Sequence, residues 1–162
     1  MFKKADKISL VSTNLTLKNK LSNALECPIC KNLANSVLLK TIKALVKDEF
    51  KDNIDNLEQF FFCKTPSCNV VYFSKDQIIY KDQLKIEVGL KEGSKKSTIC
   101  YCFNWTKDMI INDFKKYGKC DVIDDIKNRI KEFGCFCEVK NPSGKCCLSD
   151  IKNFIDENLQ NY

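Results

Sequence analysis

The sequence predicts an α+β protein made of two parts in succession. In the first part, residues 25–90, a helical segment precedes a stretch rich in aromatic and β-branched residues, which favour strands. In the second part, residues 99–162, apolar residues recur at helical spacing between short polar loops. We therefore expect a helix with a small antiparallel β-sheet, followed by a helical subdomain.

The elements of the first part follow from residue spacing. Residues 1–24 are polar, and we expect an extension that is flexible or only briefly helical. Residues 34–47 carry apolar side chains at helical spacing and predict a helix. Residues 59–88 hold apolar stretches around turn residues and predict two or three antiparallel strands. Residues 91–98 are rich in Lys, Ser and Gly and predict a flexible linker between the two parts.

The second part predicts three helices. Thr106 is a good N-cap and Gly118 a good terminator for the first, and Gly134 ends the second. The Asn-Pro-Ser-Gly stretch at 141–144 predicts a turn, and a last helix is expected over residues 148–158. The side chains expected to be buried on the first two helices are Met109, Ile110, Phe114, Val122, Ile126, Ile130 and Phe133.

Eleven cysteines and no histidine are the most informative feature of the composition. Short-spaced thiols bring two ligands to one metal ion, and without imidazole a soft-metal site must be all-thiolate, which favours zinc or an iron–sulfur cluster. A disulfide scaffold is disfavoured because the count is odd and we find no signal peptide, so we expect a cytoplasmic protein. Ten of the cysteines form five groups, Cys27/Cys30, Cys63/Cys68, Cys100/Cys102, Cys135/Cys137 and Cys146/Cys147.

The first four cysteines predict a structural zinc site. Cys27 and Cys30 are separated by two residues, and Cys63 and Cys68 by four, so two turns can place four sulfurs tetrahedrally around one ion. Such a closed site would pin the helix to the sheet and supply folding energy to a small unit. A redox dithiol at the first pair is the alternative, but its βαβ context is missing.

The later cysteines predict a second metal site, a [2Fe–2S] cluster. A Cys-x-Cys loop that leads into a helix is unusual for zinc and common for clusters. Cys146 competes with its neighbour for one ligand position, Cys135 is a less favoured candidate, and Cys120 is expected to be a buried apolar thiol. A second zinc is the alternative. The expected cluster ligands are Cys100, Cys102, Cys137 and Cys147.

The formal net charge of +6 does not by itself indicate a nucleic-acid partner. Each four-thiolate site would add about −2, and the lysines are interleaved with acids, which is typical of a solvated mixed surface. Binding to nucleic acid is therefore not favoured. No apolar run approaches the roughly 20 residues of a membrane span, so no membrane association is expected.

Four stretches of the sequence together resemble a known family. FFCKTPSCNVVYF, KIEVGLKE, CYCFNWTKDMI and CEVKNPSGKCC closely resemble the N-terminal metal domain of archaeal CopZ copper chaperones. The Cys-x-Cys loop with its helix is more distantly similar to bacterioferritin-associated ferredoxins. The resemblance implies zinc on Cys27, Cys30, Cys63 and Cys68, and a [2Fe–2S] cluster on Cys100, Cys102, Cys137 and one of Cys146 and Cys147.

The resemblance also implies a redox role, in which the domain supplies an electron that reduces Cu(II) to Cu(I). The sequence contains no Met-x-Cys-x-x-Cys copper loop, so we do not expect this chain alone to work as a two-domain copper chaperone. No hydrolytic or acid–base chemistry is expected, because no histidine can activate a nucleophile. Any turnover would be redox, as in a metal reductase.

The leading hypothesis is one-electron transfer through a [2Fe–2S] cluster, with a structural zinc and a role in copper reduction or metal homeostasis. Its partners would be a redox protein or a metal ion such as Cu(II), and the sequence allows a weak homodimer. One alternative is a module that holds Cu(I) on spare thiolates. Another is a zinc-only structural or nucleic-acid-binding module.

Overall fold

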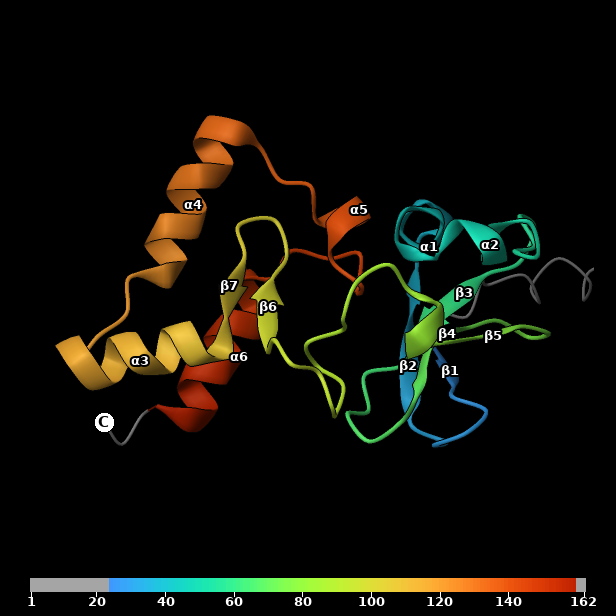
Figure 1. Ribbon diagram of the computed structural model, residues 1–162, viewed down its shortest axis with the longest axis horizontal. Coiled ribbons are helices and arrows are strands. Elements are labelled where there is room, and N and C mark those ends of the chain that lie inside the picture. Colours follow the sequence, from blue (N-terminus) through green and yellow to red (C-terminus); the bar gives the residue numbers. More distant parts are fainter. Residues whose placement is uncertain (1–23, 160–162) are drawn as a thin grey trace, which may run out of the picture.

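The computed structural model describes residues 24–159, so the extension expected over residues 1–24 lies almost wholly outside it. Figure 1 shows a sheet unit, with β1 to β5 and the short helices α1 and α2, beside a helical unit built from α3, α4 and α6. The protein is therefore α+β, as predicted. No helix within residues 24–159 is long and apolar enough to cross a membrane.

The sheet unit is a five-stranded antiparallel sheet in the order β1-β2-β3-β4-β5. Phe60 and Tyr72 are buried on the sheet and pack with Ile42 of the adjoining helix α1. These three side chains belong to the main core of the unit. The elements are β1 Ala24–Glu26, β2 Leu33–Val37, α1 Leu39–Leu45, α2 Asp48–Lys51, β3 Phe60–Phe62, β4 Val70–Phe73, β5 Ile78–Tyr80 and the 3-10 turn η1 Lys81–Gln83.

The helix predicted over residues 34–47 is wrong in its first turn. Residues 33–37 form strand β2, which pairs with β1 on one side and β3 on the other, and α1 begins only at Leu39. Leu38, at the junction, has an extended backbone and is half exposed. The apolar spacing is compatible with both structures, and pairing with the distant Phe60–Phe62 segment selects the strand.

Two or three strands were expected within residues 59–88; three are present, and they end earlier than predicted. β3, β4 and β5 cover residues 60–80, and the chain then turns through η1. Beyond it, Leu84 makes only an isolated bridge to Val46. Its side chain is nevertheless buried in the core, which explains the apolar signal of this segment.

The helical unit begins with a two-stranded ribbon and continues with the predicted helices. The Thr106 hydroxyl accepts a hydrogen bond from the Met109 N–H at 3.2 Å, as expected of an N-cap, and Gly118 ends the helix with φ of +70°. The elements are β6 Thr98–Cys100, β7 Trp105–Thr106, α3 Lys107–Tyr117, α4 Val122–Phe133, α5 Cys137–Lys140 and α6 Leu148–Asn158.

The core of the helical unit contains most of the predicted residues. Ile110, Val122 and Ile126 are fully buried together with Ile151 of α6. Met109 was predicted to be buried but is 45% exposed, because it lies about 100° around α3 from Ile110. Phe133, also predicted to be buried, is 61% exposed at the last position of α4. Phe114 and Ile130 pack partly buried against this core.

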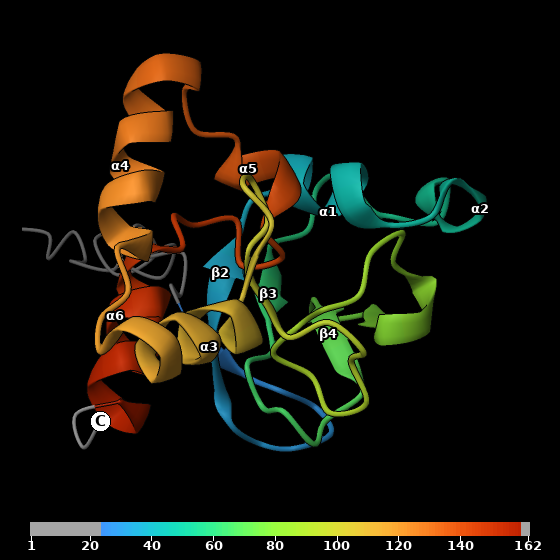
Figure 2. The same ribbon diagram turned by 60° about the vertical axis from the view of Figure 1, so that its left-hand side comes forward.

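Helix α5 joins the two units by packing on α1 (Figure 2). The Thr41 hydroxyl, fully buried on α1, donates a hydrogen bond to the Glu138 carbonyl at 2.6 Å, and Lys40 forms an ion pair with the Glu138 carboxylate. The turn after α5 is held by the sheet, because the buried Tyr72 hydroxyl donates to the Pro142 carbonyl at 2.8 Å. The sheet unit therefore fixes the segment that carries the last cysteines.

The predicted turn at residues 141–144 is present. The Gly144 N–H donates to the Asn141 carbonyl at 2.8 Å, and Gly144 has φ of +66°. The predicted linker 91–98 is anchored at its first residue, because the buried Lys91 ammonium donates a hydrogen bond to the Thr65 carbonyl at 2.9 Å. That contact holds the segment against the loop between β3 and β4. A domain boundary at residues 91–98 remains a prediction.

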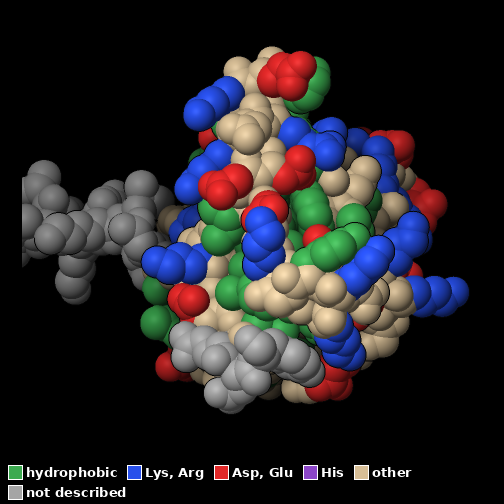
Figure 3. Space-filling model, turned by 90° about the vertical axis from the view of Figure 1, so that its left-hand side faces the viewer, with side chains coloured by type: hydrophobic (Ala, Val, Ile, Leu, Met, Phe, Trp, Pro, Cys, Tyr) green, Lys and Arg blue, Asp and Glu red, His purple; other side chains and the backbone are tan. Residues whose placement is uncertain are grey.

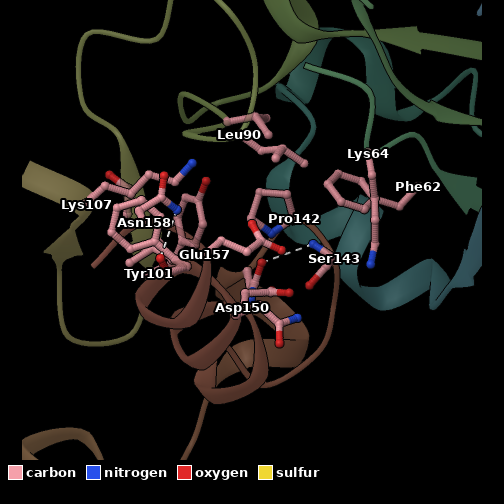
Figure 4. A pocket seen from close by; sticks show the side chains of 16 residues that line it. Phe62, Lys64, Leu90, Tyr101, Lys107, Pro142, Ser143, Asp150, Glu157 and Asn158 are labelled. Atoms are coloured by element: carbon pink, nitrogen blue, oxygen red, sulfur yellow. Dashed lines mark hydrogen bonds between the residues drawn. The ribbon is translucent and has the colours of Figure 1, made fainter. Parts of the chain in front are cut away.

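A cavity of about 420 Å³ lies between the two units (Figure 4). Phe62, Lys64 and Leu90 reach it from the sheet unit, and Tyr101 and Asp150 from the helical unit. No cysteine lines it, so it is separate from the thiol groups. On the face turned toward the viewer in Figure 3, acidic and basic side chains are interspersed, and no patch of one sign dominates.

Candidate metal centres

The first thiol group lies at one end of the sheet. Cys27 follows β1 directly and Cys30 lies in the turn to β2, where the Cys27 N–H donates to the Asn32 carbonyl at 2.9 Å. Cys63 follows β3 directly, and Cys68 lies just before β4. Two adjacent hairpin connections therefore bring the four predicted zinc ligands together, and their sulfurs all lie within 4.8 Å of one another.

The separations of these sulfurs fit a tetrahedral metal. The Cys27 and Cys68 sulfurs are 4.0 Å apart, and those of Cys30 and Cys63 are 3.6 Å apart. Zinc–sulfur bonds of about 2.3 Å correspond to tetrahedral edges of about 3.8 Å. Three of the four side chains are buried and only Cys30 is half-buried. The group thus has the donor set and closure of a structural site.

Local hydrogen bonds favour the thiolate form at one position. Burial acts to raise the pKa of Cys30, but the Thr65 hydroxyl at 3.2 Å and the Asn32 backbone N–H outweigh it and lower that pKa to about 6. The Asn32 side chain donates to the same Thr65 oxygen, which leaves the hydroxyl proton free for the sulfur. At Cys27 burial raises the pKa to about 12. Thr65 was not identified from the sequence, because its role depends on the folded loop.

The second thiol group forms where three segments of the helical unit meet: the β6–β7 hairpin, the start of α5 and the residue before α6. Cys100 ends β6, Cys102 lies in the turn before β7, Cys137 begins α5, and Cys147 precedes α6. The Cys102 and Cys137 sulfurs are 3.5 Å apart, and the Cys147 thiol interacts with those of Cys100 and Cys137. The structure therefore brings together all four residues predicted as cluster ligands.

The structure separates the adjacent cysteines that the sequence left in competition. Cys147 is fully buried against Cys100 and Cys137, whereas Cys146 is exposed. Cys135, the less favoured candidate, has its sulfur 3.1 Å from that of Cys137. The Cys-x-Cys spacing it shares with the first pair of this group was the available sequence signal.

Mutual hydrogen bonding also stabilises thiolates in the second group. The Cys147 thiol is the main cause that lowers the pKa of Cys137 to about 5, and it lowers that of Cys100 to about 7. Burial raises the pKa of Cys102 to about 12. The Cys147 pKa is raised strongly by its two thiol neighbours and by burial. Such a set favours shared binding of a cation, which compensates the repulsion between thiolates.

The remaining cysteine, Cys120, belongs to neither group. Cys120 is half-buried between α3 and α4, with its sulfur 3.5 Å from the Asp113 carboxylate. Burial and the adjacent carboxylate raise its pKa to about 11. The expected apolar environment is thus only partly present, and the thiol is held protonated.

Comparison with known proteins gives consistent results. Residues 24–85 match the zinc binding domain of CopZ. The chain is 37% identical over 123 residues to the copper chaperone CopZ of Archaeoglobus fulgidus, an alignment that covers 76% of this chain and 58% of that protein. The chain therefore spans little more than half the length of this relative.

The crystal structure of the N-terminal domain of Archaeoglobus fulgidus CopZ has the same fold. The two superpose with a TM-score of 0.67 at 33% sequence identity, covering 80% of this chain and 96% of that one. Because 80% of the chain is more than residues 1–90 contain, the match extends beyond the sheet unit into the helical unit. This chain belongs to the CopZ N-terminal domain family, and its first unit is a zinc-binding domain.

Proposed function

We propose that this protein is a redox domain that transfers single electrons through a [2Fe–2S] cluster and is stabilised by a structural zinc. In this proposal Cys27, Cys30, Cys63 and Cys68 hold zinc, and Cys100, Cys102, Cys137 and Cys147 hold the cluster. When bound, such a cluster accepts and releases one electron. The observation that carries the proposal is the convergence of the second four thiols from three segments of the chain.

The second thiol set divides into two pairs, as a two-iron centre requires. Cys102 and Cys137 are 3.5 Å apart, close to the edge of a tetrahedral metal thiolate. Cys100 and Cys147 form a second, fully buried pair. With no histidine in the chain, an all-cysteine centre is the consistent choice.

The rest of the chain positions these thiols and limits solvent. Phe103 and Trp105 pack against the core that contains Cys100 and Cys147. The Trp105 indole N–H donates to Asp125 at 2.8 Å and fixes the ring beside the ribbon. Burial of this kind tunes the reduction potential of a metal thiolate site.

The proposed zinc acts at a distance from the redox centre. It would tie β1, β2, β3 and β4 together at one end of the sheet, and the sheet unit in turn holds the segment that follows α5. Loss of zinc would thus loosen the support of Cys137 and Cys147. This links a structural metal to the geometry of the redox site.

Copper is the proposed electron acceptor. The related full-length protein is a copper chaperone, and in this proposal Cu(II) is a substrate that gains one electron and becomes Cu(I). A separate redox protein would supply that electron. Soft thiolates favour Cu(I) over Cu(II), so a thiol-rich environment favours the reduced product.

Spectroscopy and copper reduction together test the proposal. Anaerobically purified protein should show visible absorption and, after reduction by dithionite, an electron paramagnetic resonance signal. Each reduced chain should convert about one Cu(II) to Cu(I), detected with a Cu(I)-specific chelator. Cys100→Ser should abolish the absorption and the reduction, whereas Cys120→Ser should retain both. Equal behaviour of the two variants would contradict the assignment.

A further inference from the structure

Three thiols form an outer group at the solvent-facing side of the second centre. The sulfurs of Cys102, Cys135 and Cys137 all lie within 4.8 Å of one another, with separations of 3.5 Å from Cys102 to Cys137 and 3.1 Å from Cys135 to Cys137. A trigonal metal with metal–sulfur bonds near 2.3 Å, as in zinc thiolates, would hold its sulfurs about 4 Å apart. Small rotations of the side chains would satisfy that geometry.

Exposure distinguishes this outer group from the inner pair. Cys135 is exposed, Cys102 is half-buried and Cys137 is buried, so the group opens from the core toward solvent. Cys100 and Cys147 are both fully buried. An ion arriving from solution can therefore meet Cys135 first and then reach the two deeper thiols.

The local backbone supports the same three thiols. Cys135 lies in the short segment between Gly134, which ends α4, and α5, which starts at Cys137. The contact of α5 with α1, through the Thr41 hydroxyl and the Glu138 carbonyl, fixes the position of Cys137. Cys135 and Cys137 are thus held as a chelating pair facing the Cys102 turn.

We propose that Cys102, Cys135 and Cys137 form a three-thiolate binding site for Cu(I) when the cluster is not assembled. Cu(I) prefers soft thiolates and accepts three ligands, whereas structural zinc takes four. Binding forms three copper–sulfur bonds and releases up to three thiol protons to solvent, with no change of oxidation state. The inference goes beyond the proposed electron transfer and does not depend on a cluster.

The site has a direct consequence for the proposed cluster. Cys102 and Cys137 belong to both sets, so copper and the cluster exclude one another at these two thiolates. Cys135 is the thiol that belongs to the copper site alone. It is therefore the residue whose removal separates the two functions.

A competition titration with Cu(I) tests the site. The full-length, zinc-containing protein is prepared without oxygen, iron is removed with a chelator, and Cu(I) is supplied against bathocuproine disulfonate. Zinc content and circular dichroism, measured in parallel, check that the fold is retained. Cys135→Ser is compared with Cys146→Ser, which removes another exposed thiol that lies near Cys135 but outside the three-thiol group.

The wild-type protein should bind about one Cu(I) per chain, and X-ray absorption should report three sulfur ligands. Cys135→Ser should lower the apparent affinity at least about tenfold, since even residues behind metal ligands contribute 10- to 100-fold. Cys146→Ser should bind as the wild type does. The proposal would be overturned if Cys135→Ser kept the wild-type Cu(I) affinity or if Cys146→Ser lost as much affinity as Cys135→Ser. It would also be overturned if copper binding released zinc, or if zinc bound this site as tightly as Cu(I). Failure of cluster assembly, measured separately as iron and sulfide, would leave this result intact.

Discussion

Replacement of Gly144 by alanine tests how the sheet unit holds the segment that carries Cys147. Gly144 has φ of +66°, and a Cβ there would lie 2.9 Å from the Thr41 hydroxyl oxygen and 3.4 Å from a Val37 methyl. The Thr41 hydroxyl is not free to move, since it is fully buried and bonded to the Glu138 carbonyl at 2.6 Å. The substitution therefore introduces backbone strain and also displaces a buried hydrogen bond.

The expected cost is the sum of two effects. A non-glycine residue in the left-handed region costs about 1 kcal/mol, and loss of the Thr41 hydrogen bond costs about 1 kcal/mol more. Gly118→Ala is the matched control, because Gly118 has φ of +70° and no atom within 4 Å of its added Cβ. The control should lose only about 1 kcal/mol.

Urea and thermal denaturation of the zinc-loaded variants measure the difference. The free energy of unfolding should fall by about 2 kcal/mol for Gly144→Ala and by about half as much for Gly118→Ala. In a chain of this size each kcal/mol lowers Tm by roughly 2–4 °C. Equal destabilisation of the two variants would refute the argument that the turn is packed against α1.

Three further predictions concern the thiols and the joint between the units. Cys63→Ser removes one buried thiolate of the proposed zinc site and should lower the zinc affinity about a hundredfold or more. After chelator treatment this variant should lose the sheet signal in circular dichroism, and retention of zinc would contradict the site. Burial and the Asp113 carboxylate raise the pKa of Cys120, so in the metal-loaded protein the rate of its alkylation by iodoacetamide should keep rising until about pH 11. Asp113→Asn should move the midpoint of this pH profile to lower pH, and an unchanged midpoint, measured by mass spectrometry, would refute this. Tyr72→Phe leaves the Pro142 carbonyl without its buried donor and should cost about 1–2 kcal/mol of unfolding free energy in urea titrations, and a cost near zero would show that the hydrogen bond is not needed.

Those parts of the structure that depend on local chemistry were predictable from sequence. The N-cap at Thr106 and the terminator at Gly118 fix α3 through hydrogen bonds and backbone angles that neighbouring residues determine. The spacing of Cys27 and Cys30 likewise predicts a turn that brings two sulfurs together, without reference to the rest of the chain. In both cases the signal and the structure lie within a few residues of each other.

Features decided by long-range contacts were not predictable in the same way. Strand β2 has apolar spacing that also suits a helix, and its pairing with β3, more than twenty residues later, selects the strand. The closeness of Cys135 to Cys102 depends on α5 docking against α1. Likewise, the burial of Cys147 and the exposure of Cys146, which the sequence left in competition, depend on how the turn at 141–144 packs on the sheet unit. These contacts exist only in the folded chain.

The proposed pair of centres, a zinc site and a separate two-iron site, can be measured as the metal and sulfide content of protein purified without oxygen. We expect about one zinc, two irons and two acid-labile sulfides per chain, one metal centre for each of the two thiol groups. Two zincs with no iron or sulfide, persisting after attempted cluster reconstitution, would contradict the redox function and leave a zinc-binding module.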